Sequence, residues 1–226
     1  NDLSDNYLKE KSDYVFLQCS SMSLRKNLKG ICKQILEKGY TEKQVQVMAP
    51  MYRGMNGIDN LNKELQEVFN PPAIDKREFT YGDVIFREHD KVLQLVNMPD
   101  ENVFNGDIGT IERIVLESES TSKKKEIYID YDGLLVKYLP KDFNSIKHGF
   151  VITIHKSQGS EFPVVIMPLS MSYHRMLYRK LVYTGITRAK KKLILLGEPQ
   201  AFLESIKNNQ EQIRKTTLKE RLKQKI

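Results

Sequence analysis

The sequence has no tryptophan, only two cysteines and four histidines, and no apolar run of about 18 residues that could form a membrane-spanning helix. Cys19 and Cys32 form no CxxC pair, so we expect neither a disulfide framework nor a zinc site. The cytoplasm is therefore the expected compartment, and no membrane contact is expected. The histidines are scattered without the spacing of metal ligands, so we expect no metal site in this chain.

The two ends of the sequence carry limited information. The first residues are polar and acidic, which excludes a secretory signal peptide, and the opening Asn suggests a piece of a longer protein. Residues 206–226 hold seven Lys/Arg and two Glu, or +5, so the rest of the chain carries about 7 − 5 = +2 of the net +7. This basic tail is either an amphipathic helix or a frayed terminus. A pI near 9.2 therefore says little about whether the folded body binds nucleic acid.

The spacing of apolar residues predicts alternating strands and helices at both ends of the chain. Ser23 is a candidate helix cap and Gly39 a helix stop, while Asn70-Pro71-Pro72 ends the second helix. The predicted strands are 13–20, 45–50, 149–154, 164–169 and 191–197, and the predicted helices are 24–36, 58–69, about 175–190 and 199–207. This alternation predicts an α/β fold with a parallel sheet covered by helices.

The pattern changes between Gly82 and about Lys147. Short β-rich runs follow one another there, separated by turn signals such as Asn105-Gly106-Asp107 and Asp132-Gly133, and no helix-length pattern intervenes. Such a segment suits a small closed barrel or a curled sheet inserted into the α/β unit. The predicted domains are residues 1–80 and 149–205 for the two parts of the α/β lobe, 81–148 for the inserted β-barrel, and 206–226 for the basic tail.

Three polar constellations follow predicted strands or helices. Arg53 lies in the loop after the strand at 45–50, where it either binds a phosphate or pairs with a surface acid. Arg188 lies between a helix and a strand, where it either reaches a transferring phosphoryl group or ties down the helix end.

The third constellation, Thr153 to Phe162, holds Thr153, His155 and Lys156, which can grip polynucleotide phosphates. Gly159 allows a positive φ or a close backbone approach. A carboxylate does not favour phosphate, so Glu161 either accepts from a ribose hydroxyl or pairs with Lys156.

Together these segments resemble superfamily 1 DNA helicases of the RecD-like/TraA-like branch. PMYRGMNGIDNLNKELQ (50–66) is similar to that family's motif IV, TIHKSQGSEF (153–162) to motif V and YTGITRAKKKLIL (183–195) to motif VI. NGDIGTI (105–111) is similar to the opening of the family's Src-homology-3-like 2B barrel, which lies between motifs IV and V. The resemblance covers roughly residues 13–203 and implies a RecA-like lobe, called 2A, interrupted by that barrel.

The resemblance also implies roles for individual residues. Arg188 would contact the γ-phosphate of ATP, with Arg53 as a second phosphate contact. Glu161 would bind the ribose, and Gly159 would let the backbone approach the nucleotide. Thr153 and His155, with Lys156 as a further candidate, would hold single-stranded DNA. The family also implies 5′-to-3′ translocation.

A phosphate-binding P-loop is absent, because none of the twelve glycines is followed by lysine. The resemblance therefore implies that ATP and Mg²⁺ are used only together with a missing N-terminal RecA-like lobe, which would hold the Mg²⁺ ligands. The chain alone is expected to be inactive as an ATP hydrolase.

Two alternatives remain at this stage. The chain could be a non-catalytic nucleic-acid-binding or partner-docking module in which the barrel is the active part. In a helicase lobe the barrel would add DNA contacts at basic or aromatic positions, with Arg87, Lys137 and Tyr138 as candidates. A nucleotide-dependent enzyme of another kind, such as a kinase, is disfavoured by the missing P-loop.

Overall fold

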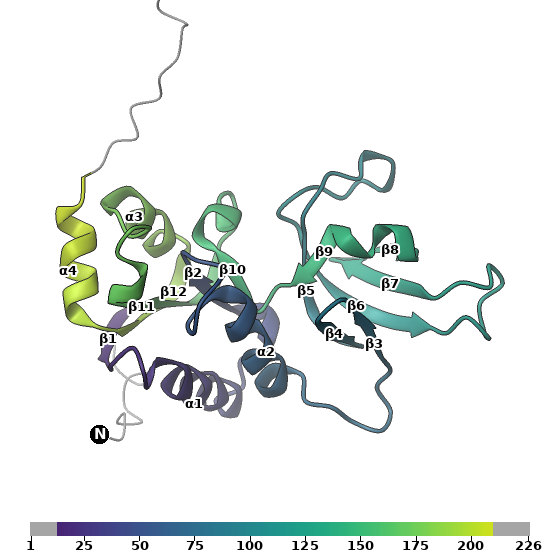
Figure 1. Cartoon of the computed structure of the whole chain (residues 1–226), viewed down its shortest axis with the longest axis horizontal. Helices are drawn as coiled ribbons and strands as arrows, with labels where there is room; N and C mark the ends of the chain where they lie inside the picture. Colours follow the sequence, from purple (N-terminus) through teal and green to yellow (C-terminus); the bar gives the residue numbers. More distant parts are fainter. Residues whose placement is uncertain (1–12, 210–226) are drawn as a thin grey trace, which may run out of the picture.

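The computed structural model describes residues 13–209, which contain a five-stranded parallel sheet (Figure 1). Its strand order is β1-β12-β11-β2-β10. The strands are β1 (Tyr14–Gln18), β2 (Val45–Ala49), β10 (Val151–Thr153), β11 (Phe162–Leu169) and β12 (Ala189–Gly197). Because every pair is parallel, the carboxyl ends of all five strands share one edge of the sheet and the amino ends share the other.

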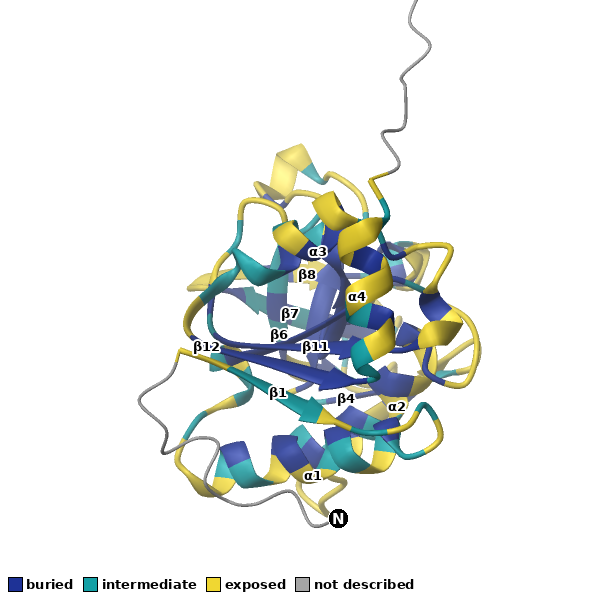
Figure 2. Cartoon of the chain, turned by 90° about the vertical axis from the view of Figure 1, so that its left-hand side faces the viewer, coloured by how far each residue is buried: buried dark blue, intermediate teal, exposed yellow. Residues whose placement is uncertain are grey.

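Helices cover both faces of this sheet, so its central strands are buried (Figure 2). Along β11, Val164 and Ile166 pack with α1 and α2, whereas Val165 and Met167 pack with α3 and α4, as the two-residue period of a strand requires. The helices are α1 (Leu24–Glu37), α2 (Ile58–Phe69), α3 (Arg179–Ile186) and α4 (Pro199–Lys207). The predicted α/β fold with a covered parallel sheet is confirmed. No helix within residues 13–209 is long and apolar enough to span a membrane.

The helix ends differ in part from the sequence prediction. Gly39 has a φ of +87° just after α1, as expected of a helix stop. Ser23 occupies the N-cap position, but its side chain makes no capping bond and contacts Ser20 instead. The third helix begins at Arg179 rather than near Arg175, because Tyr178 has an extended backbone that no helix can include.

The segment between α2 and β10 forms an antiparallel sheet of order β8-β7-β6-β5-β9 and a separate β3–β4 hairpin. Their strands are β3 (Glu78–Tyr81), β4 (Val84–Arg87), β5 (Lys91–Gln94), β6 (Ile108–Val115), β7 (Glu126–Tyr131), β8 (Leu134–Tyr138) and β9 (Ile146–His148). Phe79 and Phe86 of the hairpin stack on each other and pack into the same apolar core as Ile111 and Ile129. This unit, which we call the barrel, therefore has a hydrophobic core of its own, separate from the two cores that line the parallel sheet. We call the α/β part with the parallel sheet the lobe.

One buried carboxylate joins the lobe to the barrel. Asp90, fully buried in the turn between β4 and β5, accepts hydrogen bonds from Gln66 Nε2 at 2.7 Å and Asn70 Nδ2 at 2.8 Å, both from the α2 region. It also accepts from the backbone N–H of Arg87 at 2.7 Å and lies 3.2 Å from Nε2 of His148 at the end of β9. The carboxylate thus binds the lobe and two separate segments of the barrel at one point.

A buried lysine makes a second connection. Lys91 at the start of β5 is 2% exposed, and its ammonium donates to the carbonyl oxygens of Glu42 and Val45, each at 3.0 Å. The ammonium also lies 5.7 Å from the centre of the Phe162 ring. Burial lowers the pKa of Lys91 to about 7, since few groups nearby compensate for the loss of water.

Where the chain returns to the lobe, the side chain of Asn62 pairs with the backbone of β10 as a neighbouring strand would. Asn62 of α2 donates to the carbonyl oxygen of Val151 at 2.9 Å and accepts from its N–H at 2.9 Å. β10 is only three residues long and lies at the edge of the sheet, so one of its sides has no strand to pair with. Asn62 therefore holds the strand from which the polar loop at Thr153 begins.

We predict that Asp90→Ala lowers the free energy of unfolding by about 3 kcal/mol or more, because it leaves several buried donors without an acceptor. Asp83→Ala is the matched control, since Asp83 is exposed in the neighbouring β3–β4 turn, and should change stability by roughly 0.5 kcal/mol at most. Urea denaturation followed by circular dichroism measures both. Equal midpoints for the two variants would contradict the role of Asp90.

We predict that stability rises between pH 7 and about pH 9.5 through Lys91. In this range the unfolded lysine keeps its proton while the folded one, with a pKa of about 7, loses it. The unfolded state therefore binds more protons, and the free energy of unfolding increases with pH, by up to about 1.4 kcal/mol per unit. Urea denaturation across this range should show a smaller slope for Lys91→Met and an unchanged slope for Lys43→Met, in which an exposed lysine near Lys91 is replaced. Identical slopes for wild type and Lys91→Met would refute the prediction.

Candidate functional site

The segment from Thr153 to Phe162 runs from one edge of the parallel sheet to the other. Thr153 ends β10 in register with Ala49, and β11 has Val164 in register with Val45. Four strand positions separate Val45 from Ala49 and two separate Phe162 from Val164, so the ends of the segment lie six positions apart along the sheet. At the spacing of a β-strand this is about 20 Å. One short loop thus connects the carboxyl edge with the amino edge.

The front of the loop, at the carboxyl edge, presents hydroxyl and imidazole groups. The Thr153 hydroxyl accepts from the backbone N–H of Lys156 at 3.1 Å and caps the short 3-10 helix η4 (Ile154–Ser157). It also hydrogen-bonds to Tyr52, whose pKa is raised above its ordinary value mainly by burial, with this hydrogen bond opposing the shift. His155 is exposed, with Nε2 3.3 Å from the hydroxyl of Tyr178. His155 therefore faces solvent at the end of β10, whereas Thr153 is 8% exposed and its hydroxyl is engaged in these bonds.

Arg53 lies on the same carboxyl edge, in the exposed loop that follows β2. The loop is a tight turn in which a side chain at Gly57 would clash with the carbonyl oxygen of Tyr52, at 2.3 Å. Backbone bonds from Ile58 and Asp59 to the loop also fix its path into α2. The structure therefore places Arg53 near the front of the loop and does not bring it to Glu161 or Arg188.

The rear of the loop, at the amino edge, meets the junction of α3 and β12. Arg188 donates from Nη1 to the carbonyl oxygen of Ser160 at 3.3 Å and from Nε to that of Thr184 at 3.2 Å. Its own carbonyl oxygen accepts from the N–H of Phe162 at 2.9 Å. Arg188 thus ties down the end of α3, one of the two possibilities, and it also joins the segments similar to motifs V and VI.

Gly159 and Glu161 lie beside Arg188. Gly159 has a φ of +88°, a backbone conformation that residues with a side chain disfavour, although a Cβ built there would have no atom within 4 Å. Glu161 is exposed and forms an ion pair with Lys190 at 3.2 Å. The alternative pairing of Glu161 with Lys156 is not what the structure shows, because Lys156 points to the barrel.

Lys156 contacts the barrel loop at Asn105-Gly106, which the sequence predicts as a turn at the opening of the barrel. Its ammonium donates to the side-chain oxygen of Asn105. A Cβ at Gly106 would lie 3.8 Å from the carbonyl oxygen of Lys156, so the two backbones also approach each other. The Asn105-Gly106 pair indicates a turn in the sequence, but the sequence does not show which distant segment this turn contacts.

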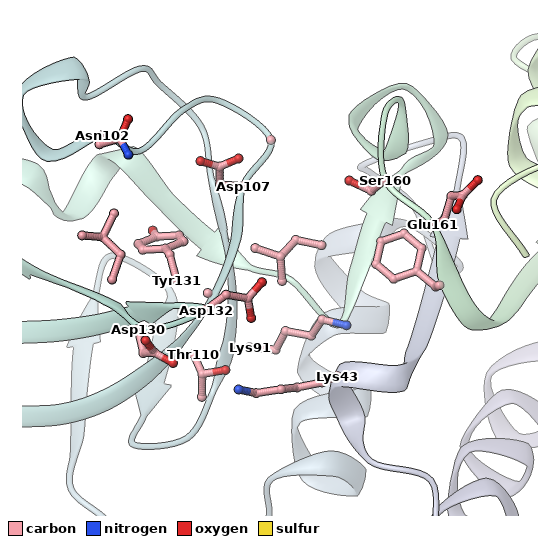
Figure 3. Close-up of a pocket in the computed structure, with 15 residues that line it drawn as sticks. Lys43, Lys91, Asn102, Asp107, Thr110, Asp130, Tyr131, Asp132, Ser160 and Glu161 are labelled. Carbon is pink, nitrogen blue, oxygen red and sulfur yellow. The ribbon is translucent and has the colours of Figure 1, made fainter. Parts of the chain in front are cut away.

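A cavity of about 560 Å³ lies between the barrel and the rear of the Thr153–Phe162 segment (Figure 3). Lys43, Ser160 and Glu161 line its lobe side, and Lys91 at the start of β5 lies between the two sides. The barrel side is acidic, with Asp107, Asp130 and Asp132. Four carboxylates against two lysines make the cavity unfavourable for phosphate groups. Among residues 13–209 no group of three or more His, Cys, Asp or Glu side chains could hold a metal ion.

The expectation that the barrel contacts DNA through Arg87 and Tyr138 is wrong. Tyr138 is fully buried, and its hydroxyl donates to Gln94 at 2.8 Å. Arg87 is 4% exposed and is bound by Glu78 and Glu67 at the junction with the lobe. Of the three proposed barrel positions only Lys137 is exposed. Whether Arg87 and Tyr138 are buried depends on which strands pair in the barrel, and residue type alone does not predict it.

Comparison with known proteins gives two family matches. Residues 61–131 match the SH3 domain of ATP-dependent RecD-like DNA helicases, and residues 148–196 match the C-terminal domain of UvrD-like helicases. The chain is 34% identical over 179 residues to the ATP-dependent RecD2 DNA helicase of Deinococcus radiodurans. It is 27% identical over 225 residues to the RecBCD enzyme subunit RecD of Buchnera aphidicola.

The chain belongs to the RecD-like family of superfamily 1 helicases. The alignment with the Deinococcus protein covers 79% of this chain and 23% of that protein, and the one with the Buchnera protein covers 93% and 36%. The RecD-like chain therefore spans about a quarter to a third of these relatives. A solved structure of Pif1 helicases at forked DNA matches with a TM-score of 0.46 and 14% identity, covering 79% of this chain and 47% of that one.

Proposed function

We propose that the chain is the C-terminal motor lobe of an ATP-dependent DNA helicase, which grips single-stranded DNA at one sheet edge and contacts ATP at the other. In this proposal residues 1–80 and 149–205 form the two parts of lobe 2A, 81–148 the 2B barrel and 206–226 a basic tail, of which residues 1–12 and 210–226 lie outside the described structure. The observation that carries the proposal is the single loop from Thr153 to Phe162, which joins both edges.

The rear of the loop has the groups that a nucleotide requires. A guanidinium has five N–H donors, and the bonds of Arg188 to Ser160, Thr184 and Thr187 use three of them, so it retains donors for a γ-phosphate. Glu161 is exposed and can accept from a ribose hydroxyl. Gly159 has a positive φ and no side chain, which would let a nucleotide come close to the backbone there. Because Arg188 holds the carbonyl oxygen of Ser160, a phosphate that attracts its guanidinium would act directly on the loop.

The front of the loop has groups that suit a sugar-phosphate backbone, namely Thr153, His155 and Lys156. Arg53 lies on this carboxyl edge, about 20 Å from the rear of the loop by strand spacing. An arginine side chain is too short to cross that distance. We therefore propose that Arg53 contacts the DNA strand rather than the nucleotide.

The loop also suggests how the two ligands communicate. A shift of Ser160 or Glu161 on nucleotide binding changes the path of a segment whose other end is the Thr153 cap of η4. Nucleotide binding and strand binding are then linked through one backbone segment, with reciprocal effects on affinity. The proposed 5′-to-3′ direction of translocation rests on the family resemblance.

The chemistry of ATP hydrolysis needs groups that this chain lacks. No glycine is followed by lysine, so there is no P-loop. In the proposal, Mg²⁺ and the P-loop belong to an N-terminal RecA-like lobe of the same protein, and Mg²⁺ offsets phosphate charge there. We predict that the purified 226-residue chain shows no Mg²⁺-dependent ATP hydrolysis above buffer in a phosphate-release assay. Hydrolysis that disappears in Arg188→Ala would contradict this.

In the full-length protein, we predict that Arg188→Ala lowers DNA-stimulated ATP hydrolysis by about 10³-fold or more, because the guanidinium stabilises charge in the transition state. Binding of single-stranded DNA should change less than threefold. Arg179→Ala is the matched control, since Arg179 is an exposed arginine at the other end of α3 whose Nε donates to the carbonyl oxygen of Ile206. It should retain hydrolysis.

This experiment also separates the motor from a non-catalytic binding module. Loss of DNA binding in Arg188→Ala with hydrolysis spared would reverse the assignment of the two edges. A full-length protein with no P-loop upstream of this chain would refute the motor function and leave a binding or docking module.

A further inference from the structure

The ammonium group of Lys156 is held by a neutral partner. It donates to the side-chain oxygen of Asn105 on the barrel, and no carboxylate of the described residues forms an ion pair with it. By contrast, the neighbouring acid of the same loop, Glu161, is paired with Lys190. An amide oxygen fixes the position of an ammonium group without cancelling its charge, and it uses one of three N–H donors.

The barrel loop that carries Asn105 is held in place by several bonds. The N–H of Asn105 donates to the side chain of Asn97 at 2.9 Å, and the N–H of Gly106 donates to the carbonyl oxygen of Gln94 at 3.0 Å. The Asp107 carboxylate accepts from the N–H of Phe104 at 2.7 Å. Val103, two residues before Asn105, is fully buried in the barrel core.

The same loop is packed directly against the helix that carries the proposed strand contacts. Gly106 has a φ of +106° and approaches the backbone of Lys156, which lies next to His155 in η4. The bond between Asn105 and Lys156 therefore connects a rigid part of the barrel with the front of the loop.

We infer that Asn105 is a positioning residue, which holds the charged Lys156 side chain of the lobe in place for a phosphate group of single-stranded DNA. The inference rests on the proposed function, since it names a barrel residue that acts on the proposed strand site. A free lysine loses much rotamer entropy when it binds a phosphate, and an ammonium already held by Asn105 loses less. The barrel then contributes to strand binding through Lys156.

The test uses four variants: two at Asn105, one at Lys156 itself and one control that adds a charge elsewhere in the same loop. Asn105→Asp has nearly the same shape but turns the amide contact into an ion pair that neutralises Lys156. Asn102→Asp adds the same charge to the same loop, at an exposed residue whose left-handed backbone (φ +54°) an Asp tolerates. Asn105→Ala removes the contact and keeps the charge of Lys156, while Lys156→Met removes that charge.

The measurement is fluorescence anisotropy of the complete 226-residue chain with a labelled oligothymidylate at several salt concentrations. We expect Asn105→Asp and Lys156→Met each to weaken binding roughly fivefold and to reduce the slope of log affinity against log salt by about 0.7, the loss of one phosphate contact on a single strand. Asn105→Ala should weaken binding about twofold with an unchanged slope. Asn102→Asp should stay within about twofold of wild type with an unchanged slope. Thermal melting shows whether each variant is folded.

The outcomes distinguish this inference from the proposed function. If wild type binds but Asn105→Asp behaves like Asn102→Asp, the positioning role is refuted while strand binding stands. The same conclusion follows if Asn105→Ala matches wild type in both affinity and slope. A wild-type chain that binds no single strand refutes the proposed strand site, and with it this inference.

Discussion

The buried Asp90 carboxylate is the interaction on which the architecture depends. A lobe interrupted between α2 and β10 must bring the two ends of its divided chain together, because an inserted unit does not by itself hold its two ends close. Asp90 binds Gln66 and Asn70 before the barrel and His148 after it, so it fixes the entrance and the exit at one point. Such a group is stable in a buried position because its acceptor capacity is used by surrounding donors.

The position of the polar loop follows from this connection. The chain leaves the barrel at His148 and immediately enters β10, whose free edge is bound by Asn62. β10 is short, so the loop begins at the carboxyl edge level with Ala49 and must return across the sheet before β11 can pair. A longer β10 would carry the loop farther beyond the edge. Because β10 and β11 run parallel, the one loop that connects them has to reach both edges of the sheet.

The sequence is sufficient for the fold and for part of the site. Apolar periodicity and the motif order predict the parallel sheet and the inserted β unit, because these depend on local patterns, and a glycine at position 159 allows the positive φ that the structure has there. The start of α3 was predicted too early because the extended Tyr178 is not visible in periodicity. The partners of Arg87, Lys156 and Glu161 could not be predicted either, because each comes from a segment brought near by strand pairing. Arg53 has the residue type of a phosphate ligand at either edge, and only strand register shows at which edge it lies.

The charged partners at the two ends of the loop differ in a way that fits two kinds of ligand. At the rear, Glu161 lies against Lys190 and near Arg188, which gives both signs of charge. A nucleotide presents both phosphate acceptors and ribose donors, so a mixed site can bind it. At the front, Lys156 is held by an amide, and the charge remains uncompensated. A polynucleotide backbone is anionic along its whole length and would be repelled by a carboxylate there. The acidic barrel residues Asp107, Asp130 and Asp132 line the cavity beside Ser160 and Glu161 instead, and none of them forms an ion pair with Lys156 among the described residues.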